Sequence, residues 1–291
     1  MARRAKPERN PESEATVELP PRVLAVGGTD PTGGAGLVRD VRTLEALGVH
    51  AAAAVTAVTV QTSRGVTDVV ALPASVVGAQ IDAALAEPGV DAIKTGMLAS
   101  FDIVQALADR VDRLGSGARL IVDPVLRSSS GRALLADDGR KLLVQRLLPA
   151  AALVTPNLAE AAELSGLTVE NREGMSRAAD QLLALGASAV LIKGGHLADY
   201  DDELDELADL LRTADGEEMW LVRERRRGMG FRGTGCTLAS AIAALLAEGF
   251  TLRAAVEGGR DAVERAMLTA PLLGLAARPL GSARRRLEDS H

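Results

Sequence analysis

Short apolar runs alternate with amphipathic segments along most of this 291-residue chain. Several apolar runs are continuous, which is typical of strands whose two faces are both covered by helices. We predict strands over Arg22–Gly27, Ala53–Val60, Val69–Leu72, Ala92–Lys94, Leu120–Asp123, Ala152–Thr155 and Ala189–Lys193. We predict helices over Ala35–Leu47, Ser75–Ala86, Phe101–Arg113, Asp138–Leu147, Leu158–Leu164, Ser176–Leu185, Thr237–Glu248 and Leu252–Leu273.

This alternation predicts one α/β domain over residues 21–280, with a mostly parallel central sheet and helices on both faces. The charged segment Tyr200–Arg227 departs from the alternation but contains a strand-like run at Met219–Arg223, so we interpret it as a small edge hairpin or flap. Residues 1–20 and 281–291 are polar and of mixed charge. We therefore expect a disordered N-terminal arm and a disordered C-terminal tail.

Composition excludes several classes of function. A formal net charge of −6 argues against a nucleic-acid-binding protein. A single cysteine excludes a disulfide within the chain and any metal site built from several cysteines. No apolar run approaches the roughly 18 residues of a membrane-spanning helix. We therefore expect a cytoplasmic protein that binds neither nucleic acid nor membranes.

Polar residues directly follow the predicted strands, where a parallel α/β sheet binds its ligands. The first strand leads into GGTDPTGGAG (27–36), which is neither a P-loop nor a spaced GxGxxG. Asp30 or Thr32 of this run could simply cap the next helix. After the second strand, the Gln61 amide could read the edge of a flat ring or make a turn hydrogen bond.

Three further strand ends carry charged groups. Asp123 ends one strand, and Lys193 ends another and is followed by two glycines, which suits either a phosphate contact or a solvated strand end. Asn157 and Glu160 share one face of a first helical turn. There a carboxylate can hold hydrated Mg²⁺, or can simply complement the helix dipole. These side chains are expected to converge at one edge of the sheet.

The run Gly233–Cys236 (GTGC) opens a helix of small residues. Its bare N–H groups and the helix dipole favour an anion, although the glycines could merely allow a sharp turn beside a buried cysteine. Two acids for magnesium, a lysine and a nest of N–H groups are the parts that phosphoryl transfer requires. The sequence therefore predicts a small-molecule kinase.

The chain resembles the ribokinase-like superfamily, and most closely its hydroxymethylpyrimidine/phosphomethylpyrimidine kinases of thiamine biosynthesis. The matching runs are GGTDPTGGAG (27–36) with Asp40 after it, VQTSRGV (60–66), IKTGML (93–98), VDPVLRSSSG (122–131), TPNLAEAAEL (155–164), LIKGGHL (191–197) and GTGCTLASAIAALLAEG (233–249). The resemblance implies a three-layer sandwich, a homodimer, and phosphorylation of 4-amino-5-hydroxymethyl-2-methylpyrimidine and/or its monophosphate with ATP and Mg²⁺.

The resemblance also implies residue roles. The substrate-binding residues would be Gly28, Asp40, Gln61, Met97 and Val125; the ATP-binding residues Asn157, Lys193, Arg232 and Thr234; the magnesium ligands Asp123 and Glu160; and the catalytic group Cys236 as base with Gly233, Gly235 and Lys193. A thiol at a helix N-terminus has a lowered pKa. We therefore expect Cys236 to accept the proton of the substrate hydroxyl or to hold that hydroxyl in line.

Two segments depart from the family pattern. GMGFR (228–232) precedes the GTGC turn, and GLAARP (274–279) replaces a glycine-rich run. Arg232 could add a cation to the phosphates or crowd the site. The alternatives to a pyrimidine kinase are a pyridoxal kinase, because relatives with the same cysteine use pyridoxal-type rings, and a catalytically silent pyrimidine-binding paralogue.

Overall fold

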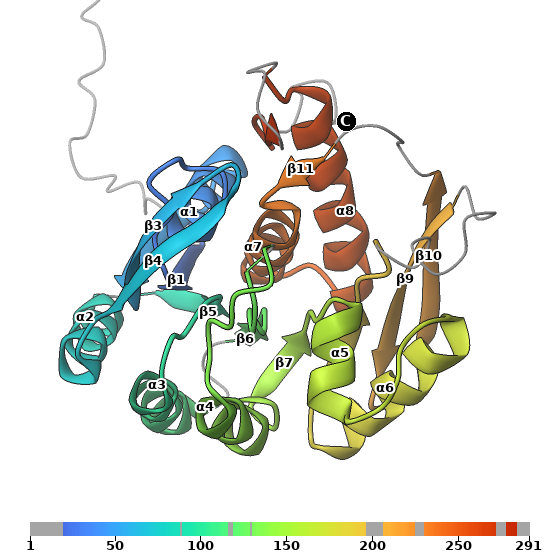
Figure 1. Ribbon diagram of the computed structural model, residues 1–291, viewed down its shortest axis with the longest axis horizontal. Coiled ribbons are helices and arrows are strands. Elements are labelled where there is room, and N and C mark those ends of the chain that lie inside the picture. The colour runs from blue at the N-terminus through green and yellow to red at the C-terminus, as the bar shows by residue number, and fades with distance from the viewer. Residues whose placement is uncertain are drawn as a thin grey trace, which may run out of the picture.

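The computed structural model describes residues 20–87, 89–115, 119–128, 130–195, 206–224, 230–271 and 278–283. An eight-stranded sheet with the order β10-β9-β8-β7-β6-β5-β1-β2 forms its centre (Figure 1). Its strands are β1 (Arg22–Gly27), β2 (His50–Val55), β5 (Val90–Thr95), β6 (Arg119–Val122), β7 (Ala151–Val154), β8 (Ala189–Ile192), β9 (Glu206–Thr213) and β10 (Glu218–Glu224). All neighbours from β2 to β8 are parallel, and β9 and β10 continue the sheet antiparallel.

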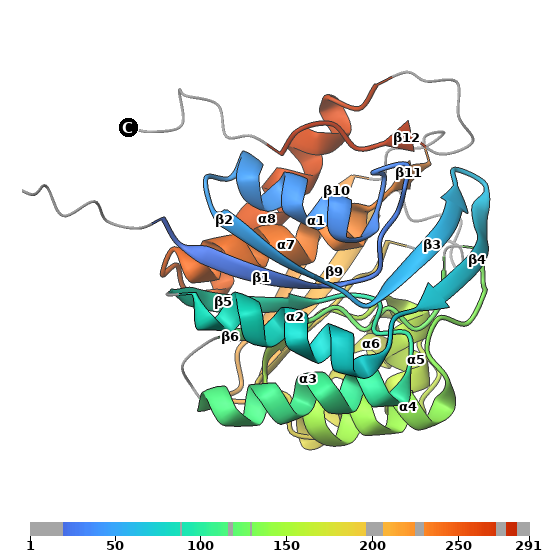
Figure 2. The same ribbon diagram turned by 90° about the vertical axis from the view of Figure 1, so that its left-hand side faces the viewer.

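Helices cover both faces of this sheet. One face carries α1 (Gly36–Ala46), α7 (Thr234–Ala247) and α8 (Leu252–Leu268). The other carries α2 (Ala74–Ala86), α3 (Phe101–Leu114), α4 (Asp137–Leu142) with a π-helical turn over Leu143–Leu147, α5 (Leu158–Ser165) and α6 (Arg172–Ala184). Figure 2 shows α1, α7 and α8 above β1 and β5, with α2, α3 and α4 below them. The predicted three-layer α/β architecture is confirmed.

The continuous apolar runs follow from this layering. In β1, Val23 and Ala25 face the core under α1, α7 and α8, whereas Leu24 and Val26 face the core on the opposite side. All four side chains are fully buried. Each residue of β1 packs against one helical layer or the other, so no position along the strand needs to be polar. The sequence of the strand therefore shows no alternation of polar and apolar residues.

The strand predicted over Ala53–Val60 is wrong in extent. The structure has two strands there, β2 and β3 (Ala57–Thr62), and β3 leaves the main sheet to pair antiparallel with β4 (Gly65–Ala71). Thr56 fixes the departure, since its N–H donates to Gly27 O at 2.9 Å and its hydroxyl donates to Met97 O at 2.6 Å. The β3–β4 hairpin projects beyond the carboxyl end of β1 (Figure 2).

The other predicted elements are shifted by a few residues. The edge hairpin predicted within Tyr200–Arg227 is the β9–β10 pair; residues 200–205 and 225–227 lie outside the described ranges. Helix α7 begins at Thr234 rather than Thr237, and α8 ends at Leu268. Of the predicted arm and tail, residues 1–19 and 284–291 also lie outside the described ranges, but Ala283 is buried in the core beside α8. Within the described ranges, no helix is both long and apolar enough to span a membrane.

Candidate active site

Asp123 and Lys193 meet at the carboxyl edge of the sheet, as predicted. Asp123 follows β6 and is 2% exposed; its Oδ1 accepts hydrogen bonds from Lys193 Nζ at 2.9 Å and Thr155 Oγ1 at 3.2 Å. Burial alone would raise the pKa of Asp123, but the ammonium groups of Lys193 and Lys94 outweigh it and hold that pKa below its ordinary value. The pair therefore places a carboxylate and a cation together at the sheet edge.

Asn157 and Glu160 form a reciprocal cap at the start of α5. Asn157 Oδ1 accepts the Glu160 N–H and Glu160 Oε2 accepts the Asn157 N–H, each at 2.9 Å. Glu160 therefore lies in the first turn of α5, as the dipole interpretation requires, and it also completes a capping box that was not predicted. Burial raises the pKa of Glu160 to about 7, against the opposing ammonium of Lys193, and the nearby charge of Asp123 adds to the rise. A second carboxylate therefore lies near Asp123, and both are influenced by the same ammonium of Lys193.

The GTGC turn opens α7 beside these groups. Gly233 is the N-cap residue with a φ of +79°, and a Cβ there would overlap the carbonyl oxygen of Gly34. A Cβ at Gly235 would lie 3.3 Å from Lys193 Nζ, so backbone and lysine are close neighbours. The Gly233 cap provides no side-chain hydrogen bond to the first turn. This leaves the first N–H groups of α7 able to receive an anion.

The Cys236 thiol differs from expectation. Burial raises its pKa to about 11, although the ammonium of Lys94 and the nearby backbone N–H of Gly36 both act to lower it. The predicted lowering of the thiol pKa is therefore wrong, because desolvation outweighs the positive end of the helix. Cys236 is a neutral thiol at physiological pH.

Asp40 lies beneath the site rather than at its surface. Its Oδ1 accepts hydrogen bonds from Lys94 Nζ at 2.8 Å and from Ser240 Oγ at 2.9 Å. The side chains of Asp40 and Lys94 are 1% and 0% exposed. The Asp40 carboxylate is therefore shielded from solvent, and its contacts join β5, α1 and α7.

Of the other residues predicted to bind substrate, Met97 and Gln61 lie beside the glycine-rich loop that carries Gly28. A Cβ at Gly28 would lie 3.1 Å from Met97 Sδ, so Gly28 and Met97 are in contact. Thr59 Oγ1 donates to Thr29 O at 2.7 Å and approaches Gln61 Oε1 at 3.3 Å, which places Gln61 on the inner side of β3. Val125 is half-buried, two residues beyond Asp123. The loop and β3 thus bring Gly28, Met97 and Gln61 into one neighbourhood.

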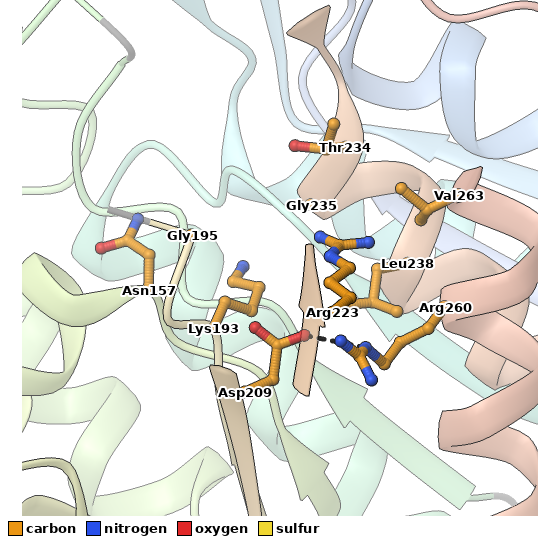
Figure 3. A pocket seen from close by; sticks show the side chains of 10 residues that line it. All are labelled: Asn157, Lys193, Gly195, Asp209, Arg223, Thr234, Gly235, Leu238, Arg260 and Val263. Carbon is orange, nitrogen blue, oxygen red and sulfur yellow. Dashed lines mark ion pairs between the residues drawn. The ribbon is translucent and has the colours of Figure 1, made fainter. Parts of the chain in front are cut away.

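A pocket of about 190 Å³ opens against the Lys193 side (Figure 3). Its lining residues are Asn157, Lys193, Gly195, Asp209, Arg223, Thr234, Gly235, Leu238, Arg260 and Val263. Arg260 Nε lies 3.1 Å from Asp209 Oδ2, and Asp209 Oδ1 accepts the Gly194 N–H at 2.9 Å. Sequence reasoning missed Asp209, Arg223 and Arg260. Arg260 could have been noticed in the sequence, because it lies four residues after Val256 and three before Val263. A charged residue on this apolar face of α8 is unusual.

Comparison with known proteins decides the family. The phosphomethylpyrimidine kinase family matches residues 30–281 of the chain. The chain belongs to the phosphomethylpyrimidine kinase family. It is 45% identical over 262 residues to hydroxymethylpyrimidine/phosphomethylpyrimidine kinase of Mycobacterium tuberculosis, which covers 90% of this chain and 93% of the relative.

Solved structures of two kinds of kinase share the fold of this phosphomethylpyrimidine kinase family member. Pyridoxal kinase from Staphylococcus aureus in complex with ADP superposes with a TM-score of 0.82 at 31% identity, covering 92% of this chain and 96% of that one. Phosphomethylpyrimidine kinase from Clostridium difficile gives a TM-score of 0.71 at 33% identity, covering 84% and 97%. The fold alone therefore does not distinguish a pyrimidine from a pyridoxal ring.

Arg232, in the segment where this family member departs from the expected pattern, contacts the glycine-rich loop. Its Nη2 lies 3.1 Å from Asp30 Oδ2, and the two side chains are 10% and 1% exposed. Arg232 belongs to β11 (Phe231–Arg232), which pairs with β12 (Arg278–Pro279). Gly228 and Met229 lie outside the described residues. The guanidinium is thus engaged by a carboxylate of the chain itself.

Proposed function

We propose that this enzyme transfers the γ-phosphoryl group of ATP to 4-amino-5-hydroxymethyl-2-methylpyrimidine and/or its monophosphate, in the cytoplasm, where ATP is available. One observation carries the proposal. Lys193, which pairs with Asp123, and the first residues of the uncapped α7 line one pocket, and Gly233, the N-cap residue of that helix, contacts Gly34 of the glycine-rich loop. Cations and oriented N–H groups are what stabilise the charge that spreads over a transferring phosphoryl group.

The pocket itself is suited to the nucleotide. Its phosphates would lie at the N-terminus of α7, near Lys193, Asn157 and Thr234. The base and ribose would extend toward α8. There Arg260 Nη2 is buried and has no hydrogen-bond acceptor among the described residues. A nucleotide oxygen or ring nitrogen would supply one.

Asp123 and Glu160 fit a magnesium site. Proteins hold Mg²⁺ through one or two carboxylates, with water and substrate phosphates completing its coordination. The raised pKa of Glu160 fits this, since a buried carboxylate near Asp123 gains from a nearby divalent cation. When bound, Mg²⁺ neutralises phosphate oxygens during transfer.

The pyrimidine would bind over Gly28 and Met97, with Gln61 at its edge and Val125 beyond. Cys236, as a neutral thiol, would hold the hydroxyl in line rather than remove its proton. A loose transition state for phosphoryl transfer demands positioning more than a strong base. The structure thus favours the second of the two roles expected for Cys236.

Steady-state kinetics with hydroxymethylpyrimidine, its monophosphate and pyridoxal would test the proposal with Mg·ATP. We expect turnover of at least one pyrimidine at a higher kcat/KM than pyridoxal. Lys193→Met is expected to abolish turnover while leaving pyrimidine binding, measured by calorimetry, within about twofold. Turnover of pyridoxal alone would show that the enzyme is a pyridoxal kinase. This is the second candidate because of the structural similarity to pyridoxal kinase, with a TM-score of 0.82. Pyrimidine binding by an inactive wild type would establish a binding paralogue.

We further propose that the enzyme is a homodimer joined through the β3–β4 hairpin. The outer face of this two-stranded sheet exposes Val58, Val60 and Val70, which are 48, 56 and 56% exposed. Val58 and Val70 are direct cross-strand partners, and Val60 shares their face, where its own cross-strand partner is the exposed Asp68. A second copy of the same face would cover it.

A further inference from the structure

The glycine-rich loop (residues 28–36) and the GTGC turn touch directly. The Gly36 N–H lies near the Cys236 sulfur, and the Cα of Gly233 faces the carbonyl oxygen of Gly34 so closely that a Cβ would not fit. The Arg232–Asp30 pair is the third contact and joins side chains rather than backbones. In the proposed function the loop holds the pyrimidine and the turn holds the phosphoryl group. The relative position of the two segments therefore sets the distance over which transfer occurs.

Asp30 organises the loop internally. Its Oδ1 accepts the Thr32 N–H at 2.9 Å and the Thr32 hydroxyl at 2.8 Å, and its Oδ2 accepts the Ala35 N–H at 2.9 Å. The side chain is 1% exposed. A carboxylate buried this deeply requires a compensating charge, and Arg232 supplies one at 3.1 Å. The shape of the loop thus depends on a cation from a different segment.

Arg232 directly precedes Gly233, the N-cap residue of α7. The guanidinium that neutralises Asp30 therefore belongs to the residue just before the turn whose N–H groups would receive the phosphoryl group. Its remaining exposure is only 10%, and the Cζ atom lies over Gly34, 3.8 Å from the position of a Cβ there. Arg232 is oriented toward the loop.

We propose that Arg232 is a positioning residue that, through Asp30, fixes the pyrimidine-binding loop against the N-terminus of α7. It does not bind the ATP phosphates. This inference rests on the proposed function for the identity of the two ligands. The contact between the two segments is independent of that identity.

Kinetics of Arg232→Met and Arg232→Lys would test the inference. We expect Arg232→Met to raise KM for the pyrimidine and lower kcat, each by roughly tenfold, with KM for ATP changed less than about twofold. Arg232→Lys, which keeps the charge, is expected to recover part of both losses. Asp30→Asn should act in the same direction, and the double variant Arg232→Met/Asp30→Asn should be no worse than the poorer single variant. A raised KM for ATP with an unchanged KM for the pyrimidine would overturn the inference and make Arg232 a phosphate ligand.

Hydrogen–deuterium exchange gives a readout that requires no substrate. The Thr32 and Ala35 amides are bonded to Asp30, so Arg232→Met should speed their exchange roughly tenfold or more relative to wild type. Arg113→Met is the matched control, because it removes an exposed ion pair between Arg113 of α3 and Asp82 of α2 and should leave residues 30–36 unchanged. Unchanged loop exchange in Arg232→Met would overturn the inference. An inactive wild type would overturn only the proposed function.

Discussion

The reactivity of Cys236 follows from its surroundings. Burial raises the pKa of this thiol to about 11, so the thiolate is scarce at neutral pH and increases as the pH rises toward that value. We expect the rate of alkylation by iodoacetamide to rise about tenfold per pH unit between roughly pH 7 and 10. Mass spectrometry would follow the modification, with Cys236→Ser as the unlabelled control, since the chain has a single cysteine. A plateau of the rate below about pH 8 would contradict the raised pKa.

Substitutions at Gly233 and Gly249 distinguish the cost of backbone strain from the cost of a steric clash. Both have positive φ angles, +79° and +90°, but a Cβ at Gly233 would overlap Gly34 O, whereas nothing lies within 4 Å of one at Gly249. Gly249→Ala should lower the free energy of unfolding by about 1 kcal/mol through backbone strain alone. Gly233→Ala should cost more than about 2 kcal/mol and also abolish kinase activity, because the turn must move. Urea denaturation and initial rates would measure the two effects. If the two variants lost the same stability and the same activity, the close contact between Gly233 and Gly34 would not matter for either property.

Residues at strand ends were predictable because a parallel sheet places them at one edge whatever their contacts. Asp123 and Lys193 meet for this reason. The burial of Asp40 was not predictable, since it depends on Lys94, a partner 54 positions away along the chain. The thiol pKa was misjudged on the same ground. The local sequence shows that Cys236 lies at a helix N-terminus, which lowers a thiol pKa. It does not show how deeply the thiol is buried, and burial raises that pKa.

At the scale of elements, apolar runs locate strands better than they locate strand ends. The run around Thr56 reads as one strand because alanine, valine and threonine continue through it. The chain nevertheless leaves the sheet there, since Thr56 bonds to Gly27 and Met97 on two other segments. Such tertiary hydrogen bonds leave no periodic signature. This is why the β3–β4 hairpin, on which Gln61 lies, was not predicted.

The Lys94–Asp40 pair joins β5 to α1, and Ser240 of α7 donates to the same carboxylate, so loss of the pair should be costly. Lys94→Met would leave the Asp40 charge buried without its partner, and we expect a loss of about 3–5 kcal/mol in the free energy of unfolding. Asp82→Asn is the matched control, because the Asp82 side chain is 49% exposed and pairs with Arg110 at the surface. It should cost at most about 1 kcal/mol. Urea denaturation of both variants would decide, and similar losses would contradict a structural role for the buried pair.

At the scale of the whole molecule, the exposed valines of β3–β4 predict how two copies associate. We expect the wild type to elute as a dimer in size-exclusion chromatography with light scattering, and Val60→Lys to elute as a monomer. In a symmetric interface the substitution brings two ammonium groups into the contact between the hairpins, where each must be desolvated and has only Asp68, the cross-strand partner of residue 60, opposite it.

Val222→Lys provides the control for that experiment. Val222 is 44% exposed on the edge strand β10, so a lysine there tests whether any added charge at an exposed valine has the same effect. It should leave the dimer intact if β3–β4 is the interface. A monomer produced by Val222→Lys but not by Val60→Lys would move the interface to the sheet edge. Because β3 also carries Gln61, loss of the dimer through Val60→Lys should raise KM for the pyrimidine more than KM for ATP.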